Sequence, residues 1–86
     1  MNYKIKESII ISPHEEGGII LDTDSGMYHE INITGVKILQ NIENGKDLKF
    51  ISNKLIEEYD IDKNKAETSI LDFIKYLIKN GFIEEG

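Results

Sequence analysis

The spacing of apolar residues changes once along the chain, close to Ile31, and this change constrains the fold more than any other feature. From Tyr3 to Ile11 apolar and polar side chains mostly alternate, which is typical of a strand with one buried face. After Ile31 apolar residues recur three and four positions apart, as they do on one side of an α-helix. The sequence therefore predicts an α+β fold in which the strands come first and the helices follow.

Three strands are expected in the first third of the chain. They cover residues 3–11, 19–21 and 27–31, and two polar, glycine-containing turns separate them, at 13–18 and 22–26. The paired glycines of the first turn are free to take positive φ. Short strands joined by such turns pair with their neighbours in sequence, so we predict a three-stranded antiparallel sheet.

Three helices are expected in the rest of the chain, because each apolar segment follows a residue that can accept hydrogen bonds at a helix N-terminus. Asn32 or Thr34 precedes the first segment, Asp47 the second and Asp62 the third. The first and third segments end at Asn-Gly pairs, which commonly follow a helix, and the third runs to about Lys79. A chain of 86 residues has room for one core, so residues 1–86 are predicted to form a single domain.

The third expected helix has apolar residues on two of its faces. The first stripe is expected to pack inward and consists of Ala66, Ile70, Phe73 and Leu77. The second stripe lies about 100° around the helix and consists of Leu71, Ile74 and Ile78, flanked by Lys75 and Lys79. One stripe suffices to pack the outer helix of a small domain. The second stripe therefore either covers the sheet as well or lines a groove for a ligand.

The charge of the chain argues against nucleic-acid binding. Sixteen acidic residues against ten basic ones give a net charge of −6, and every basic residue is a lysine. Affinity for DNA comes from neutralising phosphates, and base recognition relies heavily on arginine. We therefore expect no nucleic-acid partner.

The residue types of common catalytic and metal sites are scarce. The chain has no cysteine, which excludes disulfides, thiolate metal sites and cysteine nucleophiles. Its two histidines, His14 and His29, have no nucleophile or suitably spaced metal ligand beside them. We expect neither enzyme activity nor a bound metal or cofactor. No stretch approaches the roughly 18 apolar residues of a membrane span, and the N-terminus lacks a signal-peptide pattern, so no membrane contact and a cytoplasmic location are expected.

The segment from Ser25 to Leu39 carries a pattern of glycine, an aromatic two residues later, an aliphatic–Asn pair, a second glycine and a hydrophobic helix start. With Gly45, the stretch 58–62 and the closing Gly81-Phe82-Ile83, this pattern resembles the PqqD-like family over residues 19–83. The departures from the family pattern are Leu39 in place of an aromatic residue, Ser69 in place of Asp and Phe82 in place of Leu.

This resemblance implies a winged-helix-like fold and a function in peptide recognition. Members of the family bind the leader segment of ribosomally made precursor peptides and act as peptide chaperones in natural product biosynthesis. Stand-alone members present the leader to a modifying enzyme, either a radical-SAM enzyme or a leader peptidase. Because this chain has no cysteine, the resemblance implies that any radical-SAM chemistry takes place on another protein.

The resemblance also implies a binding site, in which the leader adds as a strand beside the third strand and lies over the third helix. The corresponding residues here are Met27, Tyr28, His29, Glu30 and Ile31 of the strand, and Leu71, Ile74, Lys75, Ile78 and Lys79 of the helix. In the strand, Met27, His29 and Ile31 share one face and Tyr28 and Glu30 the other. The sequence leaves open which face meets the helix, and for Tyr28 it favours inward packing.

Two other functions remain open at this stage. A winged-helix DNA-binding regulator would share the fold, although its recognition helix should be more basic. A structural subunit could dock its apolar stripe on an enzyme, because a leader groove and a protein interface look alike in sequence. The sequence also leaves open whether the chain forms a homodimer, which precursor it recognises and which chemistry the partner enzyme performs.

Overall fold

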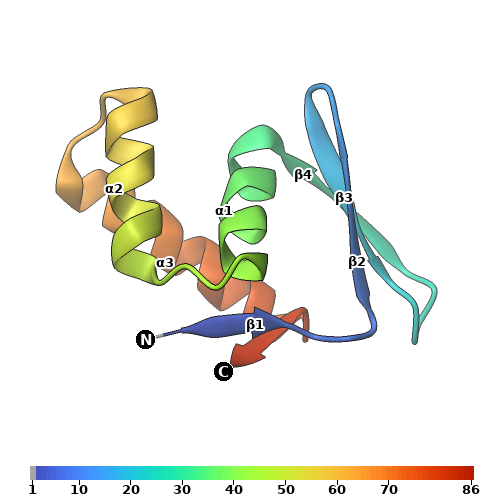
Figure 1. Cartoon of the computed structure of the whole chain (residues 1–86). Coiled ribbons are helices and arrows are strands. Elements are labelled where there is room, and N and C mark those ends of the chain that lie inside the picture. Colours follow the sequence, from blue (N-terminus) through green and yellow to red (C-terminus); the bar gives the residue numbers. More distant parts are fainter. Residues whose placement is uncertain (1) are drawn as a thin grey trace.

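The computed structural model describes residues 2–86 and contains two small sheets and three helices (Figure 1). In chain order the elements are β1 (Tyr3–Ile5), β2 (Ile9–His14), β3 (Gly17–Asp22), β4 (Tyr28–Asn32), α1 (Ile33–Glu43), α2 (Leu48–Tyr59), α3 (Lys63–Lys79) and β5 (Ile83–Glu85). Strands β2, β3 and β4 form an antiparallel sheet in that order. This confirms the predicted α+β, winged-helix-like fold, in which a three-stranded antiparallel sheet precedes three helices.

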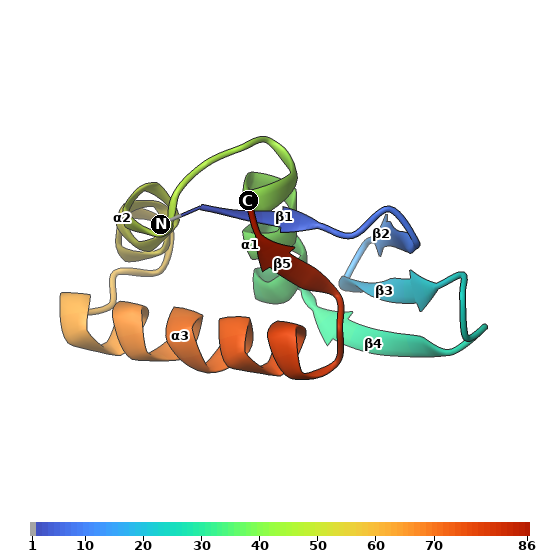
Figure 2. The same ribbon diagram turned by 90° about the horizontal axis from the view of Figure 1, so that it is seen from below.

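The first expected strand is divided in two, and this corrects the prediction of one strand over residues 3–11. The chain turns after β1, where the Ile9 amide donates to the Lys6 carbonyl over 3.0 Å. Strand β1 leaves the three-stranded sheet and pairs with β5, so that Tyr3 lies opposite Glu85 and Ile5 opposite Ile83 (Figure 2). The partner of β1 is almost the whole chain away, which is why its alternating pattern could not reveal the pairing.

The first turn is shorter than predicted, and its glycines have a different role. Strand β2 continues to His14, and β3 begins at Gly17, which lies opposite His14. Gly17 and Gly18 do not have positive φ. They are required because of close packing: a Cβ on Gly18 would lie 2.7 Å from Cγ2 of Val36, and one on Gly17 would collide with the Ile31 carbonyl oxygen. The glycine pair therefore lets β4 and α1 approach β3 closely.

All three predicted helix caps are present, and Asn32, not Thr34, caps the first helix. The side chains of Asn32, Asp47 and Asp62 each accept a hydrogen bond over 2.8 Å from the backbone amide three residues later. Each helix therefore begins where a short polar side chain satisfies an amide that the helix itself cannot.

The hydrophobic core lies between the helices and the inner face of the three-stranded sheet. Its most completely buried large side chains are Ile20, Leu39, Ile51, Ile70, Leu77, Phe82 and Ile83. Phe82 and Ile83 extend this core from the last helix into β5. Helix α1 lies between the sheet and α2, as Figure 1 shows, whereas α3 runs past both helices and its C-terminal half reaches β4 (Figure 2).

Candidate functional site

A groove of about 530 Å³ lies between β4, the start of α1 and the middle of α3. Strand β4 contributes Glu30 and Ile31, and α3 contributes Phe73 and Tyr76. At the start of α1, Gly35 allows close approach, because a Cβ there would lie 3.0 Å from the tip of the Phe73 ring. The groove therefore has a strand along one wall and aromatic side chains along the other.

The strand wall has an unpaired backbone edge. Within residues 2–86, strand β4 is at the edge of its sheet and pairs with β3 alone. The Asp22 amide donates to the Met27 carbonyl over 2.9 Å, so the alternation of an antiparallel pair points the His29 and Ile31 amides toward β3. The amides of Tyr28 and Glu30 then point toward the open edge. An extended peptide can hydrogen-bond to these groups.

The face of β4 that meets α3 is the one carrying His29 and Ile31. The His29 Nδ1 lies 3.1 Å from the Tyr76 hydroxyl, and the His29 ring contacts the Phe82 ring edge-on, with 4.8 Å between centroids. Tyr28 lies on the opposite face and is 64% exposed, so the expectation that it packs inward was wrong. The alternation of the strand decides this, because only every second side chain can reach the core.

The wall formed by α3 differs from the predicted one. It consists of Ser69, Phe73 and Tyr76, which recur four and three positions apart and therefore share one face. The rings of Phe73 and Tyr76 stack with 6.0 Å between their centroids. Phe73, predicted to belong to the inward stripe, is only partly buried and packs against the edge of the core. In the sequence, the spacing of Phe73 and Tyr76, two aromatic residues three positions apart, could have predicted this wall.

The expected second stripe of α3 does not line the groove. Ile74 is only 2% exposed and belongs to the core, which corrects its placement on an open surface. Leu71 and Ile78 are about half exposed, but they lie on the other flank of the helix. Lys75 and Lys79 are exposed and do not line the groove either. The predicted and the observed faces lie on nearly opposite sides of the helix, about 165° apart at 3.6 residues per turn.

A small polar cluster lies next to Thr34 at the α1 end of the groove. Lys37 Nζ donates to Glu58 over 2.7 Å and to the Tyr59 hydroxyl over 3.3 Å, and Thr34 Oγ1 donates to the same hydroxyl over 3.3 Å. The hydrogen bond to Glu58, followed by that to Tyr59, raises the pKa of Lys37 above its ordinary value. The hydrogen bonds from Thr34 and then Lys37 lower the pKa of Tyr59.

Within residues 2–86, no group of three His, Cys, Asp or Glu side chains is arranged to hold a metal ion. Over the same residues, no helix is both long and apolar enough to cross a membrane. What the groove offers is therefore hydrogen-bonding backbone groups and aromatic surface.

The sequence pattern of the family described as Coenzyme PQQ synthesis protein D (PqqD) matches residues 17–83. This is more than three quarters of the chain. The chain belongs to the PqqD family. The match confirms the resemblance inferred from the spacing of glycine, aromatic and aliphatic–Asn positions.

Two solved structures are similar to this PqqD-family chain over nearly its whole length. TbiB1 in complex with the TbiA(beta) leader peptide has a TM-score of 0.88 and 23% identity, over 94% of each chain. Lasso peptide synthetase B1 complexed with the leader peptide has a TM-score of 0.89 and 25% identity, over 98% of this chain and 99% of that one. At 23% identity, the similarity to TbiB1 is a similarity of fold alone. No curated protein matches the chain in sequence.

Proposed function

We propose that this PqqD-family protein binds the leader segment of a ribosomally made precursor peptide by adding it as a strand to β4. It then presents the peptide to a separate modifying enzyme, a radical-SAM enzyme or a leader peptidase. The observation that carries the proposal is the open edge of β4, which runs along a groove walled by the stacked Phe73 and Tyr76. The similarity to a lasso peptide synthetase B1 complexed with a leader peptide supports it.

Backbone and side chains contribute differently to this binding. Hydrogen bonds to the Tyr28 and Glu30 amides hold any extended segment in register, whatever its sequence. Every second leader side chain then faces the groove, where an apolar or aromatic residue packs on Phe73 and Tyr76. Leader residues facing the other way lie beside the exposed Tyr28. Sequence selectivity therefore comes from the groove-facing positions.

The structure allows a revision of which residues take part. We retain Tyr28, His29, Glu30 and Ile31, because β4 provides the open edge and His29 supports Tyr76. On α3 we propose Ser69, Phe73 and Tyr76 instead of the second stripe. Met27 precedes β4 and is exposed, so it lies at the end of the added strand.

We place the chemistry on a second protein. The chain supplies no cysteine for an iron–sulfur cluster, and among the described residues that line the groove no serine or threonine hydroxyl is hydrogen-bonded to a histidine. Holding an extended peptide at an exposed edge leaves the rest of the precursor free to reach another active site. Recognition and reaction are thereby separated between two proteins.

Amide hydrogen exchange followed by NMR tests the proposal without altering the protein. The probe is the leader peptide encoded beside the gene. In the free protein the amides of Tyr28 and Glu30 should exchange rapidly, and those of His29 and Ile31 slowly, because only the latter pair with β3. Addition of the leader should slow exchange at Tyr28 and Glu30.

A scrambled peptide of the same composition serves as the control. Equal protection by both peptides would indicate nonspecific adhesion, and would count against leader recognition. Protection that appears elsewhere, while the Tyr28 and Glu30 amides still exchange rapidly, would contradict strand addition at β4.

A further inference from the structure

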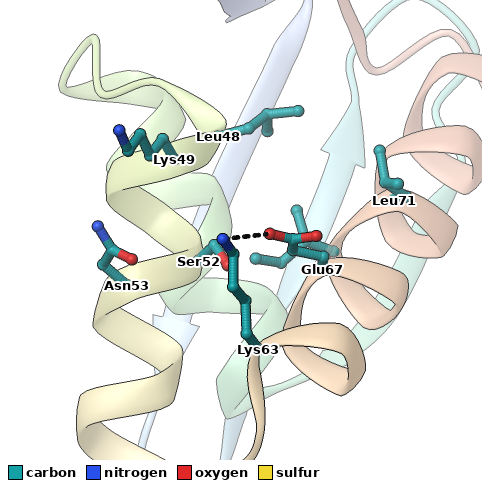
Figure 3. A pocket seen from close by; sticks show the side chains of 8 residues that line it. Leu48, Lys49, Ser52, Asn53, Lys63, Glu67 and Leu71 are labelled. Carbon is teal, nitrogen blue, oxygen red and sulfur yellow. Dashed lines mark ion pairs between the residues drawn. The ribbon is translucent and has the colours of Figure 1, made fainter.

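A second hollow, of about 320 Å³, lies between α2 and α3 (Figure 3). By the helical spacing of its lining residues, it lies on the flank of α3 roughly opposite the groove beside β4, called the leader groove from here on. Its apolar walls are Leu48 of α2 and Ile70 and Leu71 of α3. It shares no lining residue with the groove beside β4. A molecule bound in the hollow would therefore not compete directly with the leader.

The hollow contains a buried hydroxyl group with no partner. Ser52 is only 7% exposed, and its Oγ has no hydrogen-bond partner among the described residues. Leaving such a group unpaired is unfavourable, because the hydroxyl has given up its hydrogen bonds to water without replacing them. Figure 3 shows the Ser52 side chain between the two helices, behind the ion pair of Lys63 and Glu67. A bound group that reaches Ser52 would satisfy this hydroxyl.

The apolar surface continues beyond the hollow along α3. Leu71 and Ile78 are seven residues apart, so they lie on the same side of the helix about 10 Å from one another. Their side chains are 49% and 46% exposed. A stripe of this length, with a hollow at one end, fits a protein segment with one apolar side chain in the hollow and others along the helix.

The charges around this stripe are mostly positive. Lys49 and Lys63 lie at the hollow, and Lys75 lies between Leu71 and Ile78. Lys79 follows Ile78, and against these four lysines stand Glu67, which is 3.9 Å from Lys63, and Asp72, which follows Leu71. The strand half of the chain is acidic instead, with two lysines against six acidic residues up to position 31. A partner segment with carboxylates around its apolar residues would be attracted to the α2–α3 flank and repelled by the strands.

We infer that the α2–α3 flank docks the modifying enzyme, through an acidic segment that packs an apolar side chain against Leu48 and Leu71 in the hollow and hydrogen-bonds the Ser52 hydroxyl with a polar group. This inference rests on the proposed leader-binding function, since it assigns the partner to whom the peptide is presented. Helix α3 then has the leader on one flank and the enzyme on the other. Both can be bound at once, as presentation requires.

The test uses the full chain, the leader peptide and the modifying enzyme encoded beside the precursor gene. Calorimetry measures the Kd of each variant for the enzyme and, separately, for the leader. In the double variant Leu71→Ser/Ile78→Ser, enzyme binding should weaken about tenfold or more, whereas leader binding should stay within about twofold. Ser52→Ala should weaken enzyme binding about fivefold, as expected for one hydrogen bond, without lowering the Tm.

Ile10→Ser is the matched control, because Ile10 is 51% exposed but lies on the outer face of the sheet. It should leave both affinities unchanged. Unchanged enzyme binding by the double variant, loss with Ile10→Ser alone, or no binding of the enzyme to the wild-type chain would each overturn the inference. Failure of the wild-type chain to bind the leader would instead contradict the proposed function, so the two can be told apart.

Discussion

The Nδ1 atom of His29 in β4 lies 3.1 Å from the hydroxyl of Tyr76 in α3, although 47 residues separate them in sequence. This contact joins the two walls of the leader groove at one point. The His29 ring is also held edge-on against Phe82, whose side chain is buried. The width of the groove therefore depends on a hydrogen bond anchored to the core.

Replacing Tyr76 with Phe should test this dependence. The loss of the hydrogen bond should lower the free energy of unfolding by about 0.5–1 kcal/mol, the lower part of the usual range because the site is partly exposed. Leader binding should weaken a few-fold, since the wall is no longer fixed. Urea denaturation and calorimetry measure the two effects. Tyr28→Phe is the control, and equal unfolding free energies for the two variants would argue against the hydrogen bond.

Ile74 and Ile78 are a matched pair on α3 that separates core from surface. Ile74→Ala should cost about 2–5 kcal/mol of stability, because the side chain is buried. Ile78→Ala should change stability by about 0.5 kcal/mol, as is usual for exposed sites. Urea denaturation of the two variants measures both free-energy changes. Similar losses at the two positions would mean that Ile78 packs against the core as well.

Substituting Gly17 should lower stability more than its ordinary backbone conformation suggests. A Cβ at Gly17 meets the backbone of β4 at Ile31, so Gly17→Ala should cost about 1–3 kcal/mol and displace the edge that receives the leader. Gly45→Ala is the comparison, because Gly45 has a φ of 79° but open space around it. Both variants should lose stability, but leader affinity should fall only for Gly17→Ala. A normal leader affinity in Gly17→Ala would show that β4 tolerates the displacement.

The cluster at the α1 end of the groove predicts the titration of Tyr59. Hydrogen bonds from Thr34 and Lys37 lower its pKa below the ordinary value of 10.0, so Tyr59 should ionise at a lower pH than a tyrosine side chain in water. Lys37→Met should move this titration upward, as followed by ultraviolet absorbance. The control is Lys79→Met, which should leave it in place. A titration of Tyr59 that is the same with and without Lys37 would contradict the assignment.

Lys37 and Tyr59 should change the free energy of unfolding with pH in opposite directions. Its pKa is raised in the folded protein above the ordinary value of 10.5, chiefly by Glu58. The contribution of Lys37 to stability is therefore fully present below pH 10.5 and is lost as the pH rises through the higher folded pKa. The lowered pKa of Tyr59 acts in the other direction, because the stability it contributes is present above the ordinary value of 10.0 and is lost as the pH falls. Neither effect should make stability vary with pH near pH 7, and urea denaturation at several pH values between about 6 and 11 measures this.

Local chemistry made the helices predictable. Each cap involves a side chain and an amide three residues away, and the burial of α1 follows from its own spacing, so Asn32, Asp47 and Asp62 could be identified without the rest of the chain. The family pattern likewise indicated β4 as the strand beside the groove, and strand alternation correctly grouped His29 with Ile31.

Features that depend on distant partners could not be predicted in the same way. The pairing of β1 with β5 depends on a register between residues 80 positions apart. The groove face of α3 depends on how the helix is rotated against α1 and β4. Phe73 and Ile74 are adjacent in sequence and both apolar, and only packing decides that Ile74 is in the core and Phe73 at the groove.

The pairing of β1 with β5 has a consequence for synthesis of the protein. Strand β1 is translated before the other strands and helices described above, yet its partner, residues 83–85, is translated after them. The core side chains Phe82 and Ile83 are made at the same late stage. Strand β1 therefore cannot pair until the last helix and β5 have been synthesised. Until then the nascent chain carries an unpaired strand and an incomplete core, and its folding is completed only after those residues emerge.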